Sequence, residues 1–119
     1  AAKSLVGKVD AIYVPTDNVA VTALEAIVQV AENNSILLVS AEKDSVNRGT
    51  VATIGLDYYK LGRQTGEMAL KIIAGEAKPQ DMPVEVQEQN DVIINLKAAK
   101  ALNVSIPKEV LDRAVEIIE

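Results

Sequence analysis

The sequence of 119 residues predicts an α/β domain built on a mainly parallel sheet. Short, nearly continuous apolar segments alternate with longer amphipathic segments over the first 75 residues. Each of these apolar segments ends in a polar turn. Continuous apolar runs are typical of parallel strands that are covered on both faces. After residue 75 the pattern changes to a charged connection and shorter segments, so the expected element order is β-α-β-(short α)-β-α-β-β-α-α.

The first strand and its turn begin the pattern. Val9–Val14 is apolar enough for a strand, and the polar turn Pro15–Asn18 follows it. The side-chain oxygen of Asp17 or Asn18 can accept from the free N–H groups that begin a helix. Apolar residues then recur at helical spacing over Val19–Glu32, which predicts one continuous helix.

Two further strands end in polar turns in the same way. Ile36–Ser40 reads as a buried parallel strand followed by the polar residues 41–45, and Val46–Gly49 as one helical turn. Val51–Ile54 is a short β-branched strand, followed by the turn 55–57.

The second half contains the strongest helix pattern in the chain. Asp57 is placed to cap a helix over Tyr58–Ala74, and Gly75 is a natural stop. The later elements expected are the strands Val84–Val86 and Val92–Ile94, the helix Leu96–Leu102 capped by Asn95, and a last helix opened by Pro107 with apolar residues Val110, Leu111, Ala114, Val115 and Ile118.

The polar turns predict a binding site, because the carboxyl ends of parallel strands meet at one edge of a sheet. Helix N-termini near Asn18 and Tyr58 would favour a carboxylate there. An ammonium group would be attracted by the carboxylates of Asp17, Glu42 and Asp57, and Tyr58 or Tyr59 would offer an aromatic surface. An edge that holds both kinds of partner suits a zwitterion such as an amino acid.

Composition excludes several classes of function. The net charge of −5 argues against nucleic acid or an anionic membrane surface as a partner. The sequence has no Cys and no His, which removes thiol nucleophiles, imidazole bases and the usual zinc ligand sets, and no cofactor motif is present. The first ten residues lack the apolar segment of a signal peptide, so an export signal would lie upstream of this chain.

Simpler interpretations stand beside the binding site. Asp17, Asn18 and Asp57 are all good helix caps, and residues 42–44 suit a solvated loop. Two other classes of function stay open. One is a carboxylate-based hydrolase that uses a pair of acidic side chains, which no nucleophile motif supports. The other is a ligand-sensing or protein-interaction domain with the same fold.

A family resemblance adds to this pattern. The segments DAIYVPTDN and GLDYYKLGRQTGEMA, together with the tail VIINLKAAKALNVSIPKEVLDRA, resemble the substrate-binding proteins of ABC transporters. The family that these segments resemble has a periplasmic-binding-protein type I-like fold, and it includes tryptophan- and tyrosine-binding components. The resemblance runs from about Gly7 to Glu119.

The resemblance implies a three-layer α/β/α lobe that is part of a two-lobed protein with its ligand closed between the lobes. On this basis residues 1–75 form most of the second, C-terminal lobe, with a hinge near residues 55–57 and the helix after it. Residues 76–119 form a connection, two short strands and terminal helices that return to the first lobe. The expected function is that of the solute-binding component of an importer, without chemical change of the ligand.

The resemblance also assigns site residues and partners. Thr16, Asp17 and Asn18 match the ligand-facing turn, and Ser40 and Glu42 lie at the next strand end. Asp57 and Tyr58 would lie at the hinge and at the edge of the ligand, whereas Lys43 departs from the small or acidic residue usual in the family. The implied partners are an amino-acid-like ligand and the membrane permease of an ABC transporter. The implied location is extracytoplasmic, periplasmic or anchored as a lipoprotein. A homodimer of this chain would cover apolar surface meant for the absent half.

Overall fold

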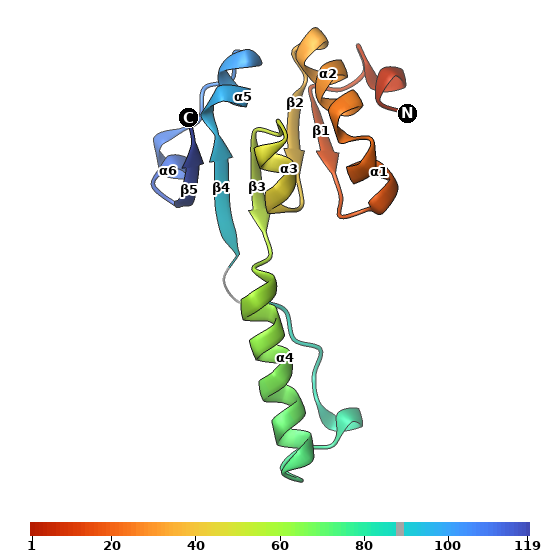
Figure 1. Cartoon of the computed structure of the whole chain (residues 1–119), viewed down its shortest axis with the longest axis vertical. Helices are drawn as coiled ribbons and strands as arrows, with labels where there is room; N and C mark the ends of the chain where they lie inside the picture. Colours follow the sequence, from red (N-terminus) through yellow and green to blue (C-terminus); the bar gives the residue numbers. More distant parts are fainter. Residues whose placement is uncertain (88–89) are drawn as a thin grey trace. The chain divides into compact units, whose positions relative to one another are not determined.

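The computed structural model describes residues 1–87 and 90–119 and contains both helices and strands (Figure 1). The strands are β1 (Ala11–Val14), β2 (Leu37–Ser40), β3 (Ala52–Gly55), β4 (Asp91–Asn95) and β5 (Ala114–Ile118). The α-helices are α1 (Asn18–Thr22), α2 (Leu24–Asn34), α3 (Lys43–Asn47), α4 (Tyr58–Ile73), α5 (Leu96–Ala101) and α6 (Lys108–Leu111). Short 3-10 helices cover Ala2–Leu5 and Pro79–Asp81.

The chain forms two compact units. Ala1–Gly55 and Asp91–Glu119 together make the first unit, and Leu56–Asn90 makes the second. This division falls after Gly55, whereas the sequence predicts two parts of a larger protein that meet at residue 75. The assignment of these parts to two lobes stays a prediction.

The first unit is organised around one sheet with the order β1-β2-β3-β4-β5. The strands β1, β2 and β3 are parallel to one another, as the alternation of elements predicts. β4 runs antiparallel to β3, and β5 runs parallel to β4. The mainly parallel sheet is therefore confirmed, and the tail of the chain extends it beyond β3.

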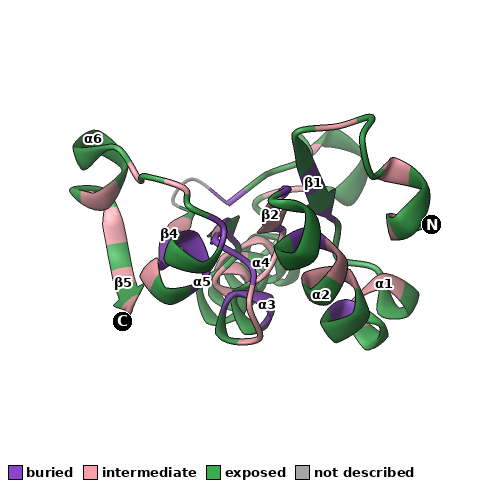
Figure 2. Ribbon diagram, turned by 90° about the horizontal axis from the view of Figure 1, so that it is seen from above, coloured by how far each residue is buried: buried purple, intermediate pink, exposed green. Residues whose placement is uncertain are grey.

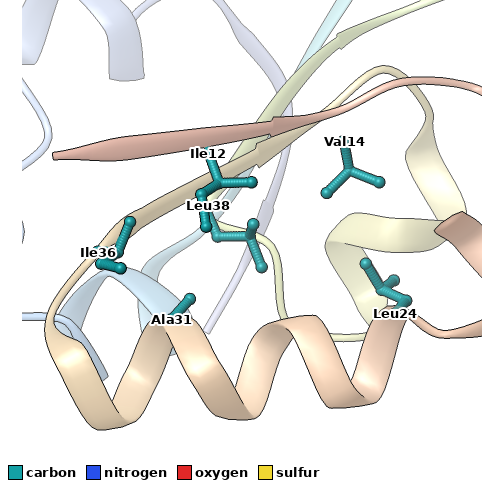
Figure 3. Packing of buried hydrophobic residues seen from close by; sticks show 6 residues of the cluster. All are labelled: Ile12, Val14, Leu24, Ala31, Ile36 and Leu38. Atoms are coloured by element: carbon teal, nitrogen blue, oxygen red, sulfur yellow. The ribbon is translucent and has the colours of Figure 1, made fainter. Parts of the chain in front are cut away.

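One face of the sheet is covered by α2. Alternate residues of β1 are buried, so Ile12 and Val14 point to this face while Tyr13 points away. Figure 3 shows the apolar side chains that meet between β1, β2 and α2, namely Ile12, Val14, Leu24, Ala31, Ile36 and Leu38. The apolar side of α2, which the spacing in the sequence predicts, therefore packs against the sheet.

A second core surrounds α5. Ala98 and Ala99 of α5 and Leu102 directly after it form this core with Val51, and Leu37 and Ala52 pack against it. Figure 2 shows the buried ribbon gathered around β4, α5 and α3, while β5 and α6 are exposed or half-buried.

The face of the sheet to which Tyr13 points is an open apolar surface. We call the residues Tyr13, Val39, Ile54 and Val92 the open sheet face. Tyr13 and Ile54 are 63% and 62% exposed. Together with Val110 and Arg113 they line a pocket of about 430 Å³.

The expected helix over Val19–Glu32 is in fact two helices. Ala23 lies between α1 and α2 with φ −98° and ψ 16°, away from helical geometry. The Thr22 hydroxyl donates to the Asn18 carbonyl at 2.6 Å. Such a bond back along the helix competes with the backbone ladder and bends helices.

Two elements of the second half also differ from expectation. Val84 and Val86 are 96% and 78% exposed and lie in a segment without regular structure, so the expected strand Val84–Val86 is wrong. Gln64 donates to the Glu85 carboxylate at 2.8 Å and to the Val86 carbonyl at 3.3 Å.

The end of the expected last helix is the strand β5. Its burial alternates with a period of two, and it pairs with β4 from Val92↔Ala114 to Asn95↔Ile118. The edge of β4 offers the β-branched residues of this segment a ladder of backbone hydrogen bonds. A short terminal helix does not provide such a ladder.

The second unit is dominated by α4, as predicted. The Asp57 carboxylate accepts from the N–H groups of Tyr59 and Lys60 at 2.9 and 3.1 Å, which begins the helix. Gly75 follows the helix with φ +74°. Within residues 1–87 and 90–119, no helix combines the length and apolar character that crossing a membrane requires.

Candidate ligand-binding rim

The ends of the first three strands lie side by side at one edge of the sheet. Val14 pairs with Ser40, and the Ala41 N–H donates to the Val14 carbonyl at 2.9 Å. Ser40 pairs in turn with Thr53, one residue before Ile54 and two before Gly55. We call residues 15–18 and 41–43 together the rim. The expected convergence of these strand ends is thus present in the first unit.

The first part of the rim is the turn from β1 into α1. Thr16, Asp17 and Asn18 are all exposed. The Asp17 carboxylate accepts from the Ala20 N–H through Oδ1 at 2.9 Å, so this residue is the N-cap of α1. A carboxylate carries two oxygens with about four acceptor sites, so capping leaves capacity for a second partner.

The second part of the rim follows β2, and Ser40 and Glu42 hold it through hydrogen bonds within the chain. Ser40 is 2% exposed, and its hydroxyl is 2.8 Å from the Thr50 hydroxyl and 3.2 Å from the Glu42 carbonyl. The Glu42 carboxylate accepts from the N–H groups of Asp44 and Ser45, both at 2.9 Å, and from the Ser45 hydroxyl. Both Glu42 oxygens therefore hold the start of α3.

Lys43 links the rim to β5 through an ion pair. Its Nζ lies 2.5 Å from Glu116 Oε2 of β5. The Glu116 hydrogen bond, helped by its charge, raises the pKa of the Lys43 ammonium. The lysine that departs from the family pattern is thus paired with the end of the chain.

Asp57 and Tyr58 belong to the second unit. The N–H of Lys60, and then that of Tyr59, lower the pKa of the Asp57 carboxyl, because both hydrogen bonds favour its charged form. Tyr58 is 63% exposed. Their part in ligand binding stays a prediction.

The arrangement can bind a small polar molecule. An exposed threonine hydroxyl, a carboxylate and an amide at residues 16–18 offer both acceptors and donors to a small polar molecule. Within residues 1–87 and 90–119, no three acidic side chains gather in a way that could hold a metal ion.

Sequence reasoning missed the residues that support the rim. Thr50 is fully buried against Ser40, and Arg48 contacts both Glu25 and Val21. Arg48 and Glu25 are 23 residues apart, so no local spacing reveals the pair. The one signal for Arg48 is that a charged residue stands directly before Gly49 and the buried residues Thr50 and Val51.

Comparison with known proteins decides the family. The model of the family described as ABC transporter substrate binding protein matches residues 1–118. The chain belongs to this substrate-binding protein family. The family is one of binding proteins and not of enzymes.

Three relatives illustrate the match. A tyrosine-binding protein of Clostridioides difficile is 41% identical over 103 residues, which cover 87% of this chain and 30% of the relative. The ABC domain from Streptococcus pneumonia, solved in complex with L-Trp, is 32% identical with a TM-score of 0.78. A substrate binding protein with adhesive properties from Clostridium difficile, in a ligand-free open structure, is 38% identical with a TM-score of 0.75.

The solved relatives confirm the fold class as a periplasmic-binding-protein-like α/β architecture. Each match covers 98% of this chain and 39% of the solved chain. The chain therefore spans about a third of the length of the relatives that it matches.

Proposed function

We propose that this chain forms part of the ligand cleft in the solute-binding component of an ABC importer. The ligand is small and amino-acid-like, and it is held between two lobes without chemical change. The observation that carries the proposal is the exposed turn Thr16–Asn18 at an edge where three parallel strands end. Ligands of open α/β sheets bind at such edges.

The side chains of the rim suggest separate roles. Asp17 binds the ammonium group, and Thr16 and Asn18 hydrogen-bond the polar part of the ligand. Ser40 and Glu42 hold the neighbouring strand end in place, because their own hydrogen bonds fix residues 41–45. In the full-length protein Asp57 and Tyr58 complete the hinge side of the cleft.

The names of the relatives support the class of ligand. One relative is a tyrosine-binding protein, and another was solved with L-Trp. On this proposal the parent protein works outside the cytoplasm, free or lipid-anchored, and delivers its ligand to a membrane permease.

A thermal-shift screen of the full-length protein with the twenty amino acids tests this proposal. A ligand present at a hundred times its dissociation constant stabilises the folded state by about 2.7 kcal/mol. We expect L-tyrosine, L-tryptophan or a related amino acid to raise the melting temperature by several degrees. A screen in which no amino acid changes the melting temperature would contradict the proposal and favour a sensing or protein-interaction domain.

A further inference from the structure

Arg48 joins three helices through one guanidinium group. It is the C-cap of α3, and its Nε and Nη2 donate to the two oxygens of Glu25 in α2 at 2.8 and 2.9 Å. Nη2 also donates to the Val21 carbonyl of α1 at 2.9 Å. A bidentate pair fixes the orientation of both partners in a way that a point charge does not.

Of these three helices, α1 has few other contacts that hold it in place. The residues of α1 are exposed or half-buried, and its contribution to the core comes from the edge contact of Ala20. The last carbonyls of a helix have no N–H partner four residues on, and a cation is favourable there. Arg48 supplies such a cation at Val21.

Close packing brings the end of α3 to α2 at the same place. Gly49 has φ +118°, and a Cβ added to it would lie 3.0 Å from Val28 Cγ1. The backbone after Arg48 therefore approaches α2 more closely than a residue with a side chain allows. This contact sets the position from which the guanidinium reaches Glu25 and Val21.

We propose that Arg48 is a positioning residue that fixes α1 and, through it, the ligand-facing turn Thr16–Asn18. The turn leads directly into α1, and Asp17 caps that helix, so a shift of α1 moves the Asp17 carboxylate. Arg48 thus couples the two parts of the rim, because it ends the helix that Glu42 begins. This inference deepens the proposed function and rests on it for the role of the turn.

Amide hydrogen exchange, followed by NMR on this chain, tests the positioning without any ligand. In Arg48→Met we expect the Ala20 and Val21 amides to exchange about tenfold faster, while the Leu38 amide of β2 keeps its rate. Arg48→Lys restores the exchange only partly, since lysine cannot form the bidentate pair. Lys108→Met, which removes another exposed ion pair, leaves α1 unchanged. Unchanged α1 exchange in Arg48→Met, or an equal increase at Leu38, would overturn the proposal.

Titration of the full-length protein with L-tyrosine and L-tryptophan tests the consequence for binding. Arg48→Met should lower the affinity for whichever amino acid binds by several-fold, and Lys108→Met should leave this affinity unchanged. Equal binding by wild type and Arg48→Met would overturn the link between Arg48 and the turn. If the wild type binds neither probe, the proposed function loses its support, whereas the exchange experiment still decides whether Arg48 positions α1.

Discussion

At the scale of single residues, three carboxylates each begin a helix. Asp17 caps α1, Glu42 caps α3 and Asp57 caps α4. The same side chains are the acidic residues that the sequence offers to an ammonium group. Capping and ligand binding are compatible at Asp17, where one oxygen holds the cap and the residue is exposed. Glu42 differs because both of its oxygens accept hydrogen bonds within the chain.

Asp57 gives a pH prediction at this scale. Hydrogen bonds from the Lys60 and Tyr59 N–H groups lower the pKa of its carboxyl below the ordinary 3.8. Its contribution to stability is therefore present above about pH 4 and is lost as pH falls through the lowered value. Asp57→Asn keeps a capping oxygen but cannot titrate.

Circular dichroism melting curves between pH 2 and pH 7 measure this effect. We expect the wild type to lose more of its melting temperature below pH 4 than Asp57→Asn does. Parallel curves for the two proteins would show that the cap does not favour the charged carboxyl.

At the scale of elements, glycines at different positions have opposite effects. Gly49 has φ +118° and faces Val28, so Gly49→Ala should destabilise the chain by at least about 1–2 kcal/mol through backbone strain. Gly62 lies within α4, and a Cβ added there meets no atom within 4 Å of those described. Gly62→Ala should therefore stabilise the helix by about 0.5–1 kcal/mol.

Urea unfolding of the two alanine variants provides the measurement. The pair shares one chemical change, so the difference in sign reports the backbone geometry at each position. A Gly49→Ala variant as stable as the wild type would contradict both the positive φ at Gly49 and the close approach of its backbone to α2.

The elements that the sequence predicts are those that short-range signals define. β1 and β2 are short, nearly continuous apolar runs, and β3 lies in a β-branched run. The helix α4 has a cap at Asp57 and a stop at Gly75. The break at Ala23 was not predictable, because the apolar spacing of Val19–Glu32 continues across it. The residues that stabilise the break are Thr22 and the distant Arg48.

The terminal strand shows a second limit of pattern reasoning. Val110, Leu111, Ala114, Val115 and Ile118 fit a helix by spacing, yet Ala114–Ile118 pairs with β4 as β5. Pairing depends on a free strand edge elsewhere in the fold, which spacing does not report. For the rim, the sequence predicted which strand ends meet, but not that Ser40 is buried or that both Glu42 oxygens are engaged.

At the scale of the whole molecule, the chain leaves apolar surface uncovered. The open sheet face includes Tyr13 and Ile54, each more than 60% exposed. Exposed contiguous apolar surface favours association. We therefore predict that this chain by itself forms a homodimer, and that Ile54→Lys converts it to a monomer.

Light scattering after size-exclusion chromatography measures the mass directly. Val19→Lys is the control, because Val19 is 79% exposed but lies in α1, outside the open sheet face. A chain that is monomeric at high micromolar concentration would contradict the prediction. Dissociation by Val19→Lys and not by Ile54→Lys would place the contact elsewhere.

We propose that the Asp17 carboxylate binds the ammonium group of an amino-acid ligand. Two substitutions separate this role from capping: Asp17→Ala removes both cap and charge, whereas Asp17→Ser keeps a capping oxygen and removes only the charge. Asp17→Ala should lower the stability by about 1 kcal/mol, and Asp17→Ser should not.

Isothermal titration of the full-length protein with the amino acid found by the thermal-shift screen is the most direct measurement. We expect both Asp17→Ala and Asp17→Ser to weaken binding by about 2–4 kcal/mol, because the ammonium group loses its charged partner in each. Wild-type affinity in Asp17→Ser would contradict it and leave Asp17 as a helix cap alone.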